Sequence, residues 1–359
     1  MITKHKTEKM KKVFLLWPLC SIVLLFNIYM SFNGYSSNLK RANVYSMNTG
    51  LNHFVKSIFN YSNDDMLNEN KRCFRLLWDF PKNGLRLDNL ITDRCKRVVT
   101  IAGSKGRTGN DMFQIAAIFG LAHVYDLIPL IPLSFPLLKY FDLPNVVNIT
   151  DGTLYNSITC RSKVAIYTNF SIKFNLVSNF TMNGCFQSWR YFERENTIIK
   201  KTLRLKSKHV MNAKRYAREV NPHGHTQVCI HVRRGDFNLP DNLKIGFTVV
   251  DEHYVEKAKR IFMQNDSNVL FLVVTDDKVW CKENLKNVTI SPFVNPGDDM
   301  ALMSLSDHVV ITSGTFGWWG AWLSGGKVVY FNGFPRPKSK LAKHFNRYDY
   351  YPQHWIGIT

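Results

Sequence analysis

The second half of the sequence repeats one unit, a short apolar run followed by a segment with helical spacing. The apolar runs are QVCIHVR, VLFLVVT, HVVIT and KVVYF, at residues 227–233, 269–275, 308–312 and 327–331. Their apolar residues are nearly continuous, which is typical of strands that are covered on both faces. Helices are predicted between them near 253–264 and 298–304. The repeat predicts an α/β fold in which helices cover both faces of a parallel sheet.

The first half contains a unit of the same kind. VVTIAG predicts a strand at 98–103, GRTGN a loop at 106–110, and DMFQIAAIFGLAHVY a helix at 111–125. In parallel sheets, ligands bind beyond the carboxyl ends of the strands. The four distinctive polar clusters of this sequence all follow predicted strands, so we expect them to share one site.

One polar cluster ends the stretch CIHVRRGDF, residues 229–237. Arg233 and Arg234 start on opposite faces of the strand because side chains alternate along it. One arginine can present a planar fork to a phosphate, while the other pairs with Asp236 or supports the turn at Gly235. The alternatives are a salt-bridged turn without a ligand and an Arg-Gly-Asp adhesion motif.

A second cluster is formed by Asp276 and Asp277 at the end of the strand 269–275. A carboxylate at this place can accept two hydrogen bonds from the N–H edge of a guanine. The alternative is a solvated turn in which an aspartate caps the next helix. The two residues are not an Asp-x-Asp triplet, and no such triplet occurs in the chain, so a metal site of that kind is not expected.

A third cluster lies in ITSGTFGWWGAWLSGG, residues 311–326. Small residues between the strand and the helix leave backbone N–H groups free to face an anion, and the helix N-terminus favours one. Thr312, Ser313 and Thr315 add hydroxyl groups. The tryptophans of this helix are expected in the core rather than as platforms for sugars: Trp318, Trp319 and Trp322.

The fourth cluster is the GRTGN loop. Gly106 and Gly109 allow a tight backbone, and Arg107 and Asn110 can bond a sugar or a phosphate. A short glycine loop by itself is weak evidence for a ligand site. The evidence is stronger here because the loop is expected at the same sheet edge as the other clusters.

The N-terminus contains an apolar run of 20 residues, 13–32, preceded by lysines. About 30 Å of helix is enough to cross a bilayer. We therefore predict a cytosolic tail at 1–12, an uncleaved signal-anchor helix at 13–32 and a lumenal remainder. A cleaved signal peptide is the alternative, but Phe-Asn-Gly at 32–34 is a poor cleavage site. Residues 33–70 are rich in Ser and Asn and predict a stem.

The net charge of +20 makes nucleic acid a partner to consider. The charge is spread along the chain without an arginine-rich block, so nucleic-acid binding is not expected. Six cysteines outside the anchor permit three disulfides in an oxidising compartment, with fifteen pairings that remain open. Six N-glycosylation sequons also suit the secretory lumen: Asn60, Asn148, Asn169, Asn179, Asn265 and Asn287.

Taken together, GRTGNDMFQIA, GCFQSWRYFE, HVRRGDF, VVTDD and SGTFGWWGAWL resemble the successive motifs of the α1,2-fucosyltransferase family, most closely its nematode branch. The resemblance runs from about Val98 to Pro335. It implies a GT-B-like fold of two Rossmann-type subdomains with parallel sheets. The anchor, stem and sequons are similar to those of a Golgi membrane glycosyltransferase of type II topology with a lumenal catalytic domain.

The resemblance also implies the reaction, an inverting transfer of L-fucose from GDP-fucose to the 2-hydroxyl of a terminal β-galactoside on a glycan. The catalytic domain would be 71–359, with an acceptor-side half at about 71–220 and a GDP-fucose-binding half at about 221–335. No divalent metal or other cofactor is implied. The alternatives are a protein O-fucosyltransferase and a catalytically inactive membrane protein that binds GDP-fucose or a glycan.

The donor site is carried over onto residues of this sequence. Arg233 stands where related fucosyltransferases have the arginine that binds the donor pyrophosphate. His231 and Asp276 would flank the guanosine, with Asp277 in the same donor site. The residues implied to line the phosphate and ribose are Ser313, Thr315 and Phe316.

The resemblance implies roles for the first loop and for a base. Asn110 would sit near the fucose, with Arg107 in the same loop. Asp111 stands where the family usually has Gln, which could alter acceptor contacts, and Phe237 stands where it usually has Tyr. Asp236 is the candidate general base beside the catalytic Arg233, although a loose oxocarbenium-like transition state needs only weak help with deprotonation.

Overall fold

The structure is a computed structural model that describes residues 73–78, 91–92, 95–148, 157–171, 179–264 and 266–359, which belong to one compact unit. The predicted tail, anchor and stem, together with the sequons at Asn60 and Asn265, lie outside the described residues. Within the described residues, no helix combines the length and the apolar character needed to cross a membrane.

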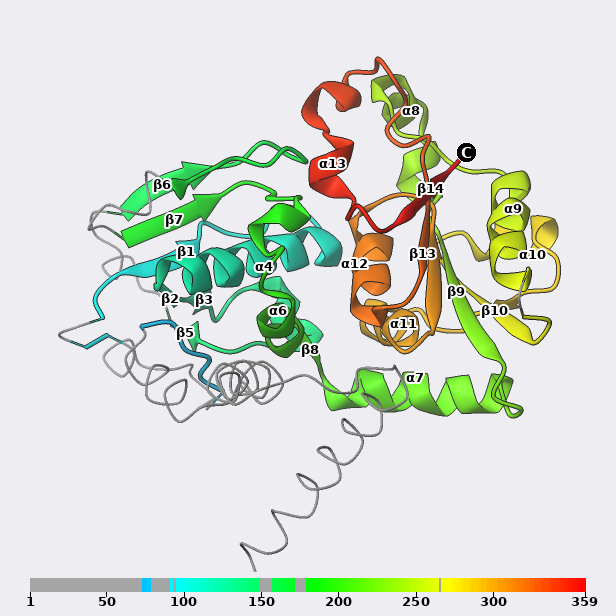
Figure 1. Cartoon of the computed structure of the whole chain (residues 1–359), viewed down its shortest axis with the longest axis horizontal. Helices are drawn as coiled ribbons and strands as arrows, with labels where there is room; N and C mark the ends of the chain where they lie inside the picture. Colours follow the sequence, from blue (N-terminus) through cyan, green and yellow to red (C-terminus); the bar gives the residue numbers. More distant parts are fainter. Residues whose placement is uncertain (1–72, 79–90, 93–94, 149–156, 172–178, 265) are drawn as a thin grey trace, which may run out of the picture. The chain divides into compact units, whose positions relative to one another are not determined.

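The first half contains a four-stranded parallel sheet (Figure 1). Its order is β2-β1-β7-β6, with bounds Ile128–Pro129, Val98–Ile101, Asn179–Asn183 and Ser157–Arg161. The helix α4, Thr108–Tyr125, follows β1 and packs on it, which confirms the predicted strand–loop–helix unit. The helix begins before the predicted Asp111, because the backbone N–H groups of Asn110 and Asp111 already donate to the Arg107 carbonyl at 2.8 and 3.1 Å.

The second half contains a six-stranded sheet in which every neighbouring pair is parallel (Figure 1). Its order is β11-β10-β9-β12-β13-β14, with bounds Thr289–Ile290, Val269–Thr275, Thr226–Val232, His308–Ile311, Val328–Phe331 and Ile356–Ile358. The four strands predicted from apolar runs are confirmed within about one residue at each end. The edge strands β11 and β14 are too short to produce such a run. Two parallel-sheet halves confirm the predicted α/β class and agree with a GT-B-like arrangement.

Strand β9 shows why its sequence is apolar at every position. Val228 and Ile230 point into a core with residues of α9, such as Val255, while Cys229 points into the other core, which contains Met300 and Trp319. Both faces of the strand are therefore buried under helices. Four of the helices around this sheet have bounds Glu252–Met263 (α9), Lys278–Asn284 (α10), Pro296–Ser304 (α11) and Thr315–Ser324 (α12). Trp318 and Trp319 of α12 are fully buried, as predicted.

The remaining helices and strands complete the fold. They are β3 Ile131–Pro132, η2 Pro136–Lys139, β4 Phe141–Asp142, β5 Val146–Val147, η3 Trp189–Tyr191, α6 Asn196–Thr202, β8 Arg204–Leu205, α7 Ser207–Val220, η4 Gly235–Asn238, α8 Pro240–Ile245, η5 Leu341–His344 and α13 Arg347–Tyr350.

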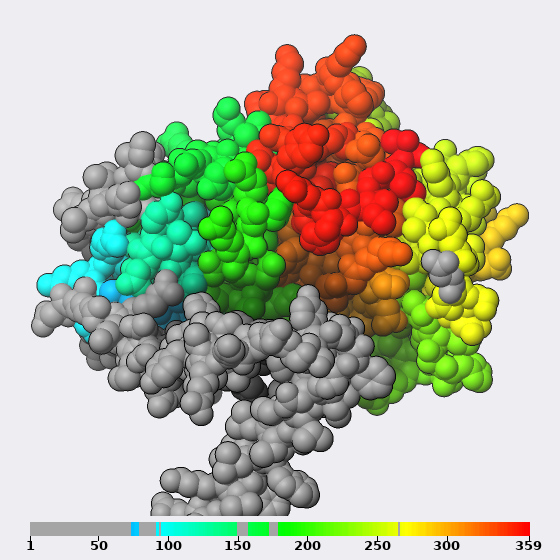
Figure 2. Space-filling view, in the orientation of Figure 1, coloured from blue at the N-terminus to red at the C-terminus, as the bar shows by residue number. Residues whose placement is uncertain are grey.

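The chain returns to the first half near its end, through residues 341–350, here called the return segment. Phe345 forms a parallel β-bridge with Ala165. The buried carboxylate of Asp349 accepts hydrogen bonds from the Tyr167 backbone N–H and from Arg190 Nη1, both at 2.9 Å. Figure 2 shows red residues of this part of the chain lying against green residues of the first half. The return segment therefore ties the two halves together.

One disulfide, Cys73–Cys95, is present among the described cysteines. It belongs to a small core with Val98 and Ile128, directly before and beside β1. Cys185, Cys229 and Cys281 are thiols, so the three disulfides that the count permits are not all formed.

Candidate functional site

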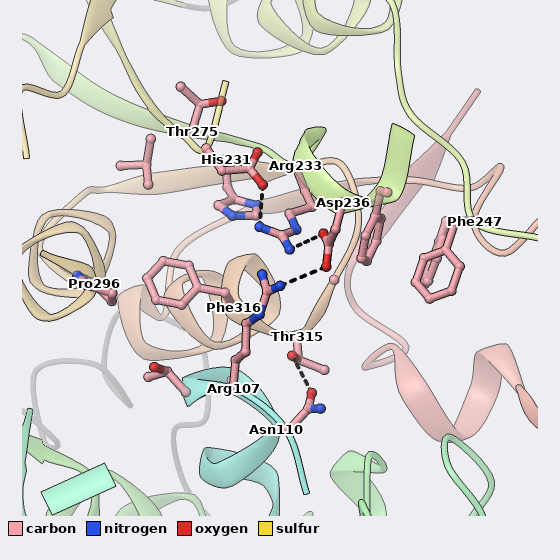
Figure 3. Close-up of a pocket in the computed structure, with 18 of the residues that line it drawn as sticks. Arg107, Asn110, His231, Arg233, Asp236, Phe247, Thr275, Pro296, Thr315 and Phe316 are labelled. Carbon is pink, nitrogen blue, oxygen red and sulfur yellow. Dashed lines mark hydrogen bonds and ion pairs between the residues drawn. The ribbon is translucent and has the colours of Figure 1, made fainter. Parts of the chain in front are cut away.

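A cleft of about 940 Å³ opens where the carboxyl ends of β9, β10 and β12 face the loop after β1. All four polar clusters identified in the sequence contribute residues to its lining, as the two-half arrangement predicts. The close-up in Figure 3 shows residues of both halves pointing toward one another in this cleft. The cleft is the candidate active site.

Arg233 occupies the centre of the cleft. Its Nη1 atom pairs with Asp276 Oδ2 and its Nη2 atom pairs with Asp236 Oδ1, so two carboxylates hold the guanidinium from different sides (Figure 3). Its backbone N–H donates to Thr312 Oγ1 at 2.9 Å, which joins the ends of β9 and β12. An arginine has five N–H donors, and these pairs use only two of them. The guanidinium is thus oriented and still able to bind a ligand.

Arg234 has a structural role, in line with the opposite directions expected of the two arginines. Its guanidinium lies 3.9 Å from the Trp280 ring, forms an ion pair with Asp277 at 3.4 Å and donates to the Val250 carbonyl at 2.7 Å. Only 13% of the side chain is exposed. An adhesion motif needs an accessible arginine, so that alternative for Arg-Gly-Asp is wrong.

The two aspartates after β10 are both engaged. Asp276 Oδ1 accepts a hydrogen bond from the Arg234 backbone N–H at 2.9 Å, and Oδ2 pairs with Arg233. Asp277 caps α10 by accepting from the Trp280 backbone N–H at 3.1 Å. Both residues line the cleft, and each Asp276 oxygen already accepts one hydrogen bond.

Arg107 reaches across the cleft from the first half. Its Nη2 atom donates to Asp236 Oδ2 at 3.0 Å, so Asp236 bridges Arg107 and Arg233 (Figure 3). The Arg107 side chain is 72% exposed, whereas that of Arg233 is 18% exposed. Asp236 could accept a proton only by giving up an ion pair, which weakens its candidacy as a general base.

The N-termini of α4 and α12 meet at the cleft. A Cβ atom at Gly109 would lie 2.5 Å from the Thr315 carbonyl carbon and 2.6 Å from the Phe316 nitrogen, so glycine is required for this approach. Thr315 Oγ1 donates to Asn110 Oδ1 at 2.7 Å, and Gln187 Nε2 donates to the same oxygen at 3.1 Å. Neither helix has a side chain capping its N-terminus among the described residues. Two positive helix ends therefore face one place in the cleft.

His231 lines the cleft beside Phe316, with ring centroids 5.7 Å apart. Burial, reinforced by the nearby Arg233 cation, lowers the pKa of His231 to about 3, so the imidazole is neutral at physiological pH. Its Nδ1 atom is buried and has no hydrogen-bond partner within the described part of the chain. This nitrogen lies against α12, since a Cβ atom at Gly317 would be 2.4 Å from it.

Two residues expected at the site lie beneath it instead. Ser313 is 1% exposed and is not among the described residues that line the cleft. Asp111 is 2% exposed, also outside that lining, and accepts a hydrogen bond from Ser104 Oγ at 2.7 Å. Burial raises the pKa of Asp111 to about 6 despite hydrogen bonds from Ser104 and the Lys105 backbone. Asp111 supports the loop before α4 rather than contacting a ligand in the cleft.

One carboxylate of the cleft was missed from the sequence. Asp299 of α11 lines the cleft, and burial raises its pKa to about 6, although Ser291 and Lys278 lower it. Ser291 Oγ donates to Asp299 Oδ1 at 2.8 Å, and no described residue hydrogen-bonds its other oxygen. Asp299 lies in a predicted helix, and no polar motif marks it in the sequence.

Within the described ranges, no group of three or more His, Cys, Asp or Glu side chains is arranged to hold a metal ion. In the described part of the chain, the positive groups that line the cleft are Arg107, Arg233, Lys278 and the two helix ends.

Residues 69–359 match glycosyl transferase family 11. A galactoside 2-alpha-L-fucosyltransferase of Mus musculus is 30% identical over 78% of this chain and 77% of that protein. A galactoside alpha-(1,2)-fucosyltransferase 2 of Rattus norvegicus is 28% identical over 71% of this chain and 75% of that protein.

Two solved structures are similar in outline. FUT1 of Arabidopsis thaliana in complex with GDP has a TM-score of 0.46 and 14% identity, covering 66% of this chain and 70% of that one. The fucosyltransferase NodZ from Bradyrhizobium has a TM-score of 0.44 and 14% identity, covering 67% and 98%. Since the family match spans the whole of both parallel-sheet halves, this chain belongs to glycosyl transferase family 11.

Proposed function

We propose that the protein is a galactoside 2-α-L-fucosyltransferase, which moves L-fucose from GDP-fucose to the 2-hydroxyl of a terminal β-galactoside on a glycan. The relatives named above carry this activity in their names. The observation that carries the proposal is the cleft centre, where Arg233 is held by two carboxylates at the meeting point of two helix N-termini.

The diphosphate of GDP-fucose binds at this centre. The N–H donors that Arg233 keeps free, the Arg107 guanidinium and the N-termini of α4 and α12 all face it. Cleavage of the sugar–phosphate bond leaves negative charge on GDP, and fixed positive groups stabilise that charge as it develops. The donor half, 221–335, thus supplies Arg233 and the N-terminus of α12, and the first half supplies Arg107 and the N-terminus of α4.

The guanine binds beyond the centre, at the end of the cleft that contains Asp299. We assign the guanine edge to Asp299 in place of Asp276, because both Asp276 oxygens are engaged and one Asp299 oxygen is not. Two N–H groups of guanine can bond one carboxylate. In Figure 3, Phe316 lies between Pro296 of α11 and Arg233, with His231 beside Arg233, and the ribose would pass here.

In the reaction, the acceptor oxygen attacks the anomeric carbon of fucose from the face opposite the diphosphate, which inverts its configuration. The bond to the diphosphate breaks and its electron pair leaves with GDP, while the hydroxyl proton passes to solvent. Asp236 holds Arg107 and Arg233 in position rather than accepting this proton. Because the positive groups belong to the chain, the proposed transfer needs no divalent cation.

An assay of fucose transfer tests the proposed function. The full-length chain in detergent is incubated with GDP-fucose and a panel of β-galactosides in the presence of EDTA. The expected result is an α1,2-linked fucose on at least one galactoside. Transfer only to a folded polypeptide, no transfer to any galactoside, or strict dependence on added Mn²⁺ would contradict the proposal.

We also propose that the protein is a single-pass type II Golgi membrane protein, anchored by residues 13–32 with its catalytic domain in the lumen. The apolar run and the sequons support this. Asn148, Asn169 and Asn287 are exposed, as glycosylation requires. Asn179 is half-buried in β7 and its side-chain oxygen accepts from the Val98 backbone N–H at 3.1 Å, so it is the poorest acceptor among the described sequons. A mobility shift on glycosidase treatment tests the lumenal placement.

A further inference from the structure

Three phenylalanines wall one end of the cleft, and the donor placement above does not use them. We call Phe237, Phe247 and Phe334 the aromatic wall. The Phe237 ring packs edge-on against Phe247 at 4.4 Å and is stacked on Phe334 at 5.8 Å. Phe247 and Phe334 lie 6.0 Å apart, so the three rings form one continuous surface.

The aromatic wall lies on the side of the cleft away from the guanine end. In Figure 3, Pro296 lies on one side of the Arg233–Asp236 pair and Phe247 lies on the other. Phe237 also joins the wall to the centre, since the Arg233 guanidinium lies 5.2 Å from its ring. A group resting on the wall would therefore adjoin the place where the fucose is released from the diphosphate.

The wall is open to a ligand. Phe334 is buried, but Phe237 and Phe247 are only half-buried, and all three line the cleft. The same lining includes Leu341 and His344 of the return segment and Val164 of the first half, which is 38% exposed. An apolar recess that opens beside a polar centre is the usual form of a site for a small organic ligand.

The chemistry of this surface suits one face of a galactose ring. In β-galactopyranose the axial 4-hydroxyl leaves three C–H groups together on the opposite face, and these can pack on aromatic rings, which offer large apolar surfaces. The 2-hydroxyl lies at the ring edge and stays free. A galactose stacked on the wall could thus direct this hydroxyl toward the cleft centre.

We propose that the aromatic wall is the acceptor subsite, which binds the apolar face of the galactose that receives fucose. This inference rests on the proposed function. The sequence suggests acceptor contacts in the GRTGN loop, but Asn110 of that loop is already hydrogen-bonded by Thr315 and Gln187. The proposed subsite lies instead in the segment after β9 and in the chain around Phe334.

The experiment removes one ring from the wall in the full-length protein in detergent. For Phe247→Ala, the expected result is a rise of about tenfold in the acceptor KM, because about 1.4 kcal/mol of lost contact is a factor of ten. The dissociation constant for GDP and the slow hydrolysis of GDP-fucose without acceptor should stay within about twofold of wild type. Phe247→Tyr keeps the ring face and should restore the acceptor KM.

Two further variants control the experiment. Tyr348→Ala removes a ring that is 77% exposed and outside the cleft lining. This variant should leave the acceptor KM and the dissociation constant for GDP unchanged. Phe247→Leu keeps most of the volume and removes the aromatic face, so it gives the same test if the alanine variant unfolds.

The outcomes separate the two proposals. If wild type transfers fucose and neither Phe247→Ala nor Phe247→Leu changes the acceptor KM, the acceptor subsite is wrong and the proposed function stands. An equal loss of GDP affinity would assign the wall to the donor and overturn the inference. If wild type binds GDP but fucosylates no galactoside, the proposed function fails and the acceptor assignment fails with it.

Discussion

Arg233 makes two ion pairs through one guanidinium, and this arrangement is specific to arginine. Lysine has a single ammonium group that cannot bond Asp236, Asp276 and a diphosphate in the same plane. For Arg233→Lys we expect kcat to fall by about 10²-fold or more, the usual cost of losing a donor at developing negative charge. Steady-state transfer assays measure this.

A matched control for that variant is Arg215→Lys, an exposed position on α7. It should keep wild-type turnover, and both proteins should unfold at the same temperature. Turnover of Arg233→Lys near that of Arg215→Lys would show that the diphosphate binds elsewhere.

Asp299 gives a prediction about pH. Its carboxyl has a pKa of about 6 because of burial, so it is ionised above this pH and protonated below it. A protonated carboxyl cannot accept both N–H groups of guanine. GDP affinity should therefore fall as pH decreases, by about tenfold for each unit below the pKa.

Calorimetric titration with GDP across this pH range measures the effect, with Asp299→Asn as the comparison. The variant should bind GDP weakly and should discriminate less between GDP and ADP, and its profile should be shallower than that of wild type, since only the terminal phosphate of GDP then titrates at about pH 6. A profile as steep in Asp299→Asn as in wild type would assign the titration to another group.

At the scale of elements, the cleft depends on how closely α4 approaches α12. In Gly109→Ala the new Cβ would lie about 2.5 Å from backbone atoms of Thr315 and Phe316, and backbone cannot move aside as a side chain can. Because a misplacement of about 1 Å can cost about 10²-fold in rate, we expect a loss of that order in kcat/KM. Activity assays and thermal unfolding of the same samples separate misplacement from unfolding.

Gly224→Ala is the control for this element. Gly224 has φ +67° in a turn with nothing within 4 Å of its Cβ position, so alanine there causes only backbone strain of roughly 1 kcal/mol. It should lower stability slightly and leave kcat/KM unchanged. Equal activity of the two alanine variants would mean that the helices need not touch.

The elements themselves were largely predictable. Continuous apolar runs predicted β9, β10, β12 and β13, because strands buried on both faces need apolar residues at every position. The polar clusters were correctly expected to converge, since the ends of parallel strands share an edge. The roles of single side chains depend on local geometry, which the sequence does not show: Asp277 caps a helix, while Ser313 and Asp111 are buried outside the cleft lining.

At the scale of the whole molecule, the return segment joins the two halves through Asp349. This buried carboxylate accepts from both the Tyr167 backbone and Arg190. Asp349→Asn replaces one acceptor oxygen by an NH₂ group that faces a donor, and a buried unsatisfied group costs about 1–3 kcal/mol. The free energy of unfolding should fall by this amount in urea titrations, and acceptor KM should rise because the segment also lines the cleft.

Tyr348→Phe is the matched control, since the exposed ring next to Asp349 is outside the cleft lining. It should match wild type in both measurements. Wild-type stability of Asp349→Asn would show that the two halves do not depend on this contact.

Contacts of this kind join residues far apart in the sequence, such as Tyr167 and Asp349, and no local pattern predicts them. The aromatic wall is hidden for the same reason, since Phe237 and Phe247 follow β9 whereas Phe334 follows β13.

The cysteines have a practical consequence for making the protein. Burial raises the pKa of the Cys281 thiol to about 11 and that of Cys229 further, so neither offers much thiolate for exchange. Among the described cysteines, only Cys73 and Cys95 are crosslinked. A reducing expression host should therefore omit this bond, at the edge of the first sheet, and mild reoxidation after purification should restore it with little exchange by Cys229 or Cys281.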